Sequence, residues 1–154
     1  MKISTVCKIL FFLVYLFLII PAPLSAEKMT ANWRITGYTK YRDAVFADIS
    51  RLAAPTPETK SIWVKLAPSN RSQYSRLINE YLQTVNKSDK GFSSIEILCE
   101  INCASHLIRF TKFMYLNNSG NIIHEVDENN LGWFLILQGN VWYNVEKEAC
   151  GERK

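Results

Sequence analysis

The sequence predicts an α+β domain: a single antiparallel β-sheet of about six strands, with one helix inserted between strands and a second helix at the C-terminus. Three observations predict this class. Short segments rich in β-branched and aromatic residues recur along the chain, several with alternating polarity. Stretches containing glycine, asparagine or proline separate them. Apolar residues recur at helical spacing between the third and fourth of these segments, and a helix-capping residue follows the last one.

The first 26 residues have the pattern of an export signal. Lys2 and Lys8 provide a basic start, residues 9–20 are an apolar run of twelve, and small residues end at Ala26. A membrane span needs about 20 apolar residues, so this run is too short to be one. We therefore expect cleavage after Ala26 and a mature domain, residues 27–154, that folds in an oxidising compartment.

The composition of the mature chain argues against nucleic-acid binding and against the need for a structural metal ion. Removal of the leader leaves 16 basic and 14 acidic residues, a net charge of +2 that is spread along the chain. This argues against a surface that binds nucleic acid. The 128 remaining residues suffice to bury one core without a metal ion. We expect one domain with no metal, no cofactor and no stable membrane span after cleavage.

The first half of the mature chain has three strand candidates, at residues 32–38, 41–49 and 61–67. Pro55 and Pro57 predict a loop over residues 51–59. A break and cap at Pro68 to Asn70 then predict the start of the inserted helix. Its apolar stripe consists of Tyr74, Leu77, Ile78, Tyr81, Leu82 and Val85.

The second half predicts three further strands and the last helix. Residues 94–103 alternate between an apolar and a mostly polar face, which is typical of a half-buried strand. Residues 106–116 are apolar on both faces, which predicts a central strand. A turn at Asn117 to Gly120 leads into a strand at 121–126, and Asn140 caps a helix that runs to about Ala149.

Three cysteines remain after Cys7 is lost with the leader: Cys99, Cys103 and Cys150. An odd number in an exported protein predicts one disulfide and one free thiol. Four residues of strand separate Cys99 from Cys103 by about 13 Å, whereas a disulfide needs Cα atoms within about 7 Å. These two cannot pair with each other, so either could be the partner of Cys150.

The chain resembles the surface-adhesin protein E-like family, over nearly all of the mature sequence and in the same order. The resembling motifs are WRI at Trp33, YRD at Tyr41, IWVK at Ile62, EINC at Glu100, IRF around Arg109, YLNNSGN at Tyr115, and a tryptophan, Trp133, seventeen residues before Cys150. The resemblance implies a disulfide between Cys103 and Cys150, which ties the last helix to the sheet. It leaves Cys99 as a buried, free thiol. The family is exported and bacterial, and its namesake binds host surfaces.

The hairpin between the fourth and fifth strands predicts an ion pair. If Ala104 and Ser105 form its tip, Ile101 faces Ile108 and Glu100 faces Arg109 on the opposite side of the sheet. The apolar side chains then share one face and the charges meet on the other. We expect this pair to be structural.

No residue set predicts catalysis. His106, His124 and Cys103 lack the compact spacing of a metal site, and the chain has neither a glycine-rich phosphate loop nor a serine elbow. The acidic residues are scattered over strands and predict solvated or ion-paired groups: Asp43, Glu96, Glu100 and Asp127. At least two of the four tryptophans should fill the core: Trp33, Trp63, Trp133 and Trp142.

Two functional interpretations follow. The resemblance implies a non-catalytic exported protein of the bacterial cell envelope that binds a protein or a cell-surface ligand. The alternative is a periplasmic housekeeping or structural factor with no adhesive role. The chain has no lipid-attachment cysteine after the cleavage site, so we expect it in the periplasm or at the cell surface without a lipid anchor.

Overall fold

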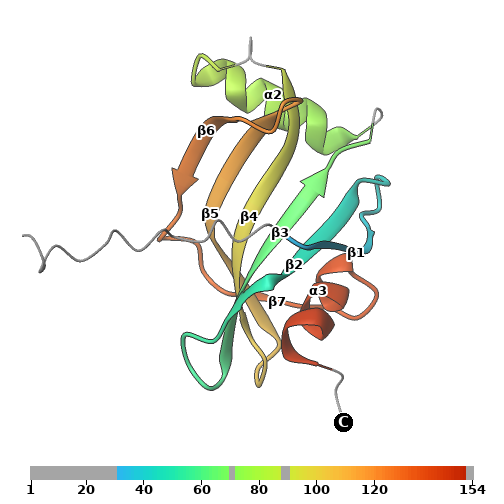
Figure 1. Ribbon diagram of the computed structural model, residues 1–154, viewed down its shortest axis with the longest axis vertical. Helices are drawn as coiled ribbons and strands as arrows, with labels where there is room; N and C mark the ends of the chain where they lie inside the picture. The colour runs from blue at the N-terminus through green and yellow to red at the C-terminus, as the bar shows by residue number, and fades with distance from the viewer. Residues whose placement is uncertain (1–30, 70–71, 88–90, 152–154) are drawn as a thin grey trace, which may run out of the picture.

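The computed structural model describes residues 31–69, 72–87 and 91–151, and these form one antiparallel sheet with two helices (Figure 1). Six strands follow one another across the sheet in chain order, and a short seventh strand pairs with the fifth. The strands are β1 (Trp33–Tyr38), β2 (Ala44–Ala53), β3 (Thr59–Ala67), β4 (Phe92–Asn102), β5 (Leu107–Asn117), β6 (Ile122–Asp127) and β7 (Phe134–Leu135). Helix α2 (Gln73–Thr84) lies between β3 and β4, and α3 (Val141–Cys150) ends the described chain. The predicted α+β class is therefore confirmed.

The predicted export signal, residues 1–26, lies outside the described residues. Within the described ranges, no helix is both long and apolar enough to cross a membrane.

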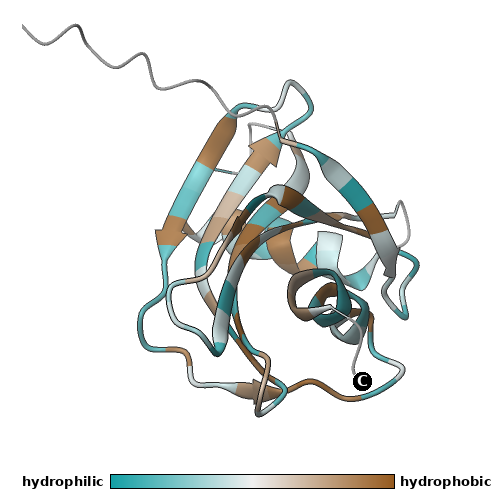
Figure 2. Ribbon diagram, turned by 60° about the horizontal axis from the view of Figure 1, so that its bottom comes forward, coloured by the Kyte–Doolittle hydropathy of each residue, from teal (hydrophilic) through white to brown (hydrophobic). Residues whose placement is uncertain are grey.

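The core lies between the curved sheet and α3, which sits inside the curve (Figure 2). Alternation along the strands sends every second side chain toward the helices. Helix α3 contributes Val141, Val145 and Ala149, and Val145 is fully buried. The buried strand residues that meet them include Val45, Ala47, Ile62, Val64, Ile97, Cys99, Ile101 and Ile108.

Several boundaries differ from the sequence expectation. The loop predicted over residues 51–59 is shorter, because β2 continues to Ala53 and β3 begins at Thr59. The second strand starts later than predicted, because Arg42 has a φ of 64° and belongs to a turn closed by a hydrogen bond from Thr39 N to Asp43 O. Helix α2 begins at Gln73, where the Ser72 side chain accepts a hydrogen bond from Ser75 N. Strand β7 was not predicted.

A disulfide joins Cys103 to Cys150, with the two Cα atoms 5.7 Å apart, and this confirms the pairing implied by the resemblance. Cys103 lies in the turn between β4 and β5, and Cys150 is the last residue of α3. A second contact joins the same two elements, since His106 Nδ1 lies 2.5 Å from Oε1 of the buried Glu146. Helix α3 is thus fixed to the hairpin turn both covalently and by a polar contact.

The hairpin has the expected register. Cys99 faces Phe110, Glu100 faces Arg109 and Ile101 faces Ile108. Arg109 Nη2 lies 2.6 Å from Glu100 Oε2, and its guanidinium also stacks over Trp133 at 4.8 Å from the ring centroid. Cys99 is fully buried and free.

Candidate functional site

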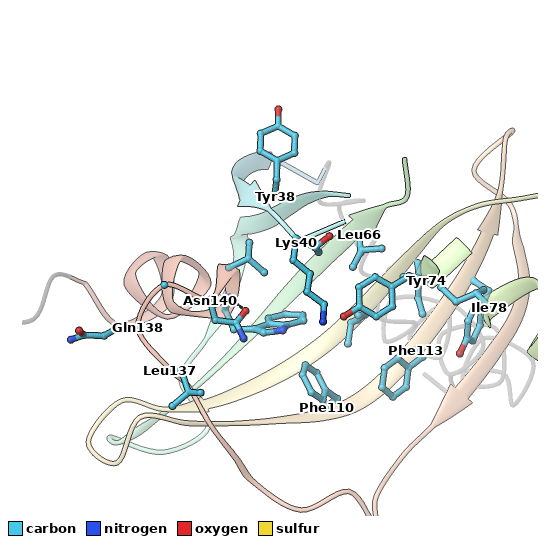
Figure 3. A pocket seen from close by; sticks show the side chains of 17 residues that line it. Tyr38, Lys40, Leu66, Tyr74, Ile78, Phe110, Phe113, Leu137, Gln138 and Asn140 are labelled. Atoms are coloured by element: carbon cyan, nitrogen blue, oxygen red, sulfur yellow. Dashed lines mark hydrogen bonds between the residues drawn. The ribbon is translucent and has the colours of Figure 1, made fainter. Parts of the chain in front are cut away.

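A groove of about 910 Å³ lies between α2, α3 and the concave face of the sheet (Figure 3). Strands β3, β4 and β5 form its floor, and the loop that precedes α3 forms one wall. The floor residues are all apolar or aromatic: Leu66, Ile95, Ile97, Phe110, Phe113 and Tyr115. A concave, mainly apolar recess with few polar groups is the usual form of a ligand site.

A β-bulge on β5 creates the aromatic part of this floor. Leu98 pairs with Lys112, but the next residue of β4, Cys99, pairs with Phe110, so Thr111 is an extra residue in β5. The extra residue shifts the alternation by one, and both Phe110 and Phe113 therefore line the groove. The Thr111 hydroxyl donates a hydrogen bond to Leu98 O at 3.2 Å, which anchors the bulge to β4.

The two helices supply the side walls. Helix α2 contributes Tyr74 and Ile78, and α3 contributes Val141 and Trp142. The Trp142 ring meets Phe110 edge to face, with centroids 5.1 Å apart, and so joins the α3 wall to the floor. Such aromatic pairs add stabilisation beyond their buried area.

Gly37 allows α3 to approach β1 closely behind this wall. A Cβ built on Gly37 would lie 3.1 Å from Asn144 Nδ2 and 3.3 Å from Val141 Cγ2. The space is used by Asn144, whose side-chain amide donates a hydrogen bond to Thr36 O at 2.9 Å. The glycine therefore sets the distance between the edge strand and the helix that carries Val141 and Trp142.

Only one charged side chain, that of Lys40, is found among the described residues that line the groove. Among the other lining residues, burial and the nearby Tyr81 raise the pKa of Tyr115 to about 12, so its hydroxyl is neutral at physiological pH. Tyr115 stacks on His124, and His124 Nε2 lies 3.1 Å from the Tyr81 hydroxyl. Apart from Lys40, the described lining of the groove is thus uncharged.

The structure does not bring the other candidate residues together. His106 contacts Glu146 and His124 contacts Tyr81, and no group of three or more metal-ligating side chains gathers in the described ranges. The acidic residues each have separate partners. Glu96 pairs with Arg51, Glu100 with Arg109 and Asp127 with Lys112, while the buried Asp43 accepts hydrogen bonds from Thr39 and from Ser69 N.

The tryptophans are less buried than expected. None of the four is fully buried, and only Trp142 packs against the core. Trp33 and Trp63 instead lie on either side of Arg51, at 5.3 and 5.1 Å from its guanidinium carbon. The expectation that at least two would fill the core is wrong, because small aliphatic residues of the strands and α3 fill it.

The groove itself was not predicted from the sequence. The sequence contains the aromatic residues of β5 and the apolar stripe of α2 that contribute to its lining. However, which face of the sheet the β5 aromatic residues occupy cannot be assigned without knowing the position of the bulge. Comparison with known proteins adds nothing to this geometry: no protein-family model, no curated protein and no solved structure matches the chain.

Proposed function

We propose that this chain is a non-catalytic binding protein of the bacterial cell envelope, and that the groove between α2 and α3 is its ligand site. One observation carries the proposal: the groove of about 910 Å³ has an apolar, aromatic floor that core side chains leave uncovered. Phe110, Phe113 and Tyr115 are only partly buried. Apolar surface left accessible in a recess of this size marks a place for a ligand.

A binding role is favoured over catalysis by the chemistry of the lining. The described lining residues include no histidine, cysteine or carboxylate that could act as a general base or an activated nucleophile beside a substrate. His106 and Cys103 are already committed to Glu146 and to the disulfide. What the groove offers is shape, apolar area and one positive charge.

Two features support a place in the cell envelope. The disulfide is typical of proteins that fold in an oxidising compartment. The first 26 residues have the pattern of an export signal. The resemblance to the surface-adhesin protein E-like family adds an adhesive role for the same domain, with a periplasmic housekeeping factor as the alternative. An antibody to residues 27–154 separates these: labelling of intact cells supports the adhesin, and labelling only after the outer membrane is opened supports the periplasmic factor.

The groove can be tested with Nile red, a neutral dye whose fluorescence rises in apolar surroundings. We expect the mature protein to bind it. Leu137→Arg should abolish the signal, because Leu137 lines the groove and an arginine there would charge its wall. Leu135→Arg is the matched control, since Leu135 lies two residues away, is 63% exposed and does not line the groove. Equal loss in both variants, or no binding at all, would overturn the proposal.

A further inference from the structure

The Lys40 ammonium group faces the groove, and none of the described carboxylates pairs with it. Lys40 is exposed, and its side chain extends into the cavity toward the side where Tyr74 lies, whereas that of Tyr38 points away from it (Figure 3). Its Nζ lies over the Tyr41 ring, 4.9 Å from the centroid, and within the described ranges no carboxylate forms a salt bridge with it. Lys112, by contrast, pairs with Glu125 and Asp127, and it does not line the groove.

The surroundings of Lys40 favour an anion. The same groove is lined by Asn140 and Val141 at the N-terminus of α3, whose first turn has no acidic residue. The N-terminal end of the helix dipole carries a partial positive charge, the same sign as that of the lysine. The rest of the lining is uncharged and continues as an apolar floor through Phe110 and Phe113 to Tyr115.

We propose that the groove binds an amphiphile with one acyl chain and one negatively charged head group, the head at Lys40 and the chain along Phe110 and Phe113. This inference rests on the proposed function, because it names the ligand class of the same site. The single cation and the apolar floor match the two parts of such a molecule. Nothing in the described lining would repel its charge.

The sheet argues against a peptide as the occupant. An extended peptide binds most readily by adding to a free strand edge, where its backbone finds hydrogen-bond partners. The floor strands β3, β4 and β5 each have a paired strand on both sides, so their backbone groups are already used. An acyl chain needs no such partners, and the floor on which it would lie is apolar or aromatic.

The test is displacement of Nile red by saturated carboxylates of eight to fourteen carbons, each below its critical micelle concentration. Each added CH₂ should tighten binding about fourfold until the groove is full. Carboxylates should bind about fivefold more tightly than alkanols of the same length, because they gain one partly exposed ion pair. Alkylammonium ions should bind more weakly than the alkanols.

Lysine variants show whether this preference comes from Lys40. Lys40→Met should remove the preference for carboxylate over alkanol, and Lys40→Arg should keep it. Lys147→Met is the matched control, because Lys147 is also exposed and also lies over a tyrosine ring, that of Tyr143 at 5.3 Å, but does not line the groove.

Four results would overturn the inference. They are equal binding of carboxylates and alkanols, affinity that does not depend on chain length, loss of preference in Lys147→Met as large as in Lys40→Met, and displacement of the dye by self-association of the protein. In all four the dye still binds in the groove, so the proposed binding function stands. Absence of dye binding would instead overturn both.

Discussion

Phe110 and Phe113 lie three residues apart on β5 and yet face the same side of the sheet, with ring centroids 6.2 Å apart. In a regular strand, residues separated by three positions face opposite sides. The extra residue Thr111 shifts the alternation by one position, so Phe110 and Phe113 face the same side of the sheet. On the other face the same shift leaves Arg109 paired with Glu100 and Lys112 paired with Glu125 and Asp127.

Deletion of Thr111 should therefore destroy the groove. Strict alternation would turn one part of β5 over, so that either Phe113 and Tyr115 or Ile108 and Phe110 leave the concave face. We expect loss of Nile red binding and a large fall in the free energy of unfolding measured in urea. Thr111→Val is the control. It keeps the strand length, removes only the hydrogen bond to Leu98 O, and should cost about 1 kcal/mol. Normal dye binding by the deletion variant would contradict the role of the bulge.

The double substitution Cys103→Ser and Cys150→Ser should lower the free energy of unfolding by about 4 kcal/mol, the chain-entropy value for a loop of this length. The bridge spans a sequence separation of 47 residues. Urea titration with and without reductant measures the effect. Reductant should destabilise the natural chain by a similar amount and leave the double variant unchanged. A fall in the stability of the variant on reduction would show that another disulfide exists.

Because of Cys99, the free energy of unfolding should depend on pH in the alkaline range. Burial raises the pKa of its thiol above the ordinary value of 9.0. The thiol thus ionises first in the unfolded chain. Its stabilising contribution is complete below pH 9 and is lost as the pH rises above it, by up to about 1.4 kcal/mol per pH unit. Cys99→Ala should remove this part of the slope.

Chemical labelling provides an independent measurement on the same thiol. Because Cys99 is fully buried, iodoacetamide should modify it slowly in the native protein and rapidly in urea. Rapid native labelling would mean that Cys99 faces solvent, and it would also remove the reason for the pH dependence.

Gly37→Ala should destabilise the protein by about 1–3 kcal/mol, because the added methyl group meets Val141 and Asn144 and the backbone φ of 153° disfavours a side chain. Gly132→Ala is the control, since a Cβ there has open space. Thermal unfolding of both variants measures the difference. Equal melting temperatures would show that α3 can move away from β1 without cost.

Much of the fold could be predicted because local signals agreed with tertiary packing. The alternation over residues 94–103 identified β4 and the buried side of Cys99. The register of the β4–β5 hairpin followed from placing its tip at Ala104 and Ser105, which sets Ile101 against Ile108 and Glu100 against Arg109. These are contacts between near neighbours in the chain, and their positions are set by strand geometry alone.

The groove could not be predicted because it depends on features without a local signal. The apolar character of residues 106–116 on both faces correctly predicted a central strand, but it did not reveal the bulge at Thr111, which moves the apolar series from one set of alternate positions to the other. Lys40 and Tyr74 meet the groove from a loop and a helix far from β5 in the sequence. Strand β7 has only two residues, too few for a pattern to be visible.

The link between Cys103 and Cys150 closes the chain into a covalent ring that contains β5, β6, β7 and the whole of α3. A protease that cuts the ring once, for example in the exposed stretch around residues 129–133, opens it without releasing a fragment. Both halves of such a nicked molecule remain attached, with Phe110 on one side of the cut and Trp142 on the other. A domain exposed to the proteases of the cell envelope would thus keep both parts of its groove after a first cleavage, and only a reducing gel would reveal the damage.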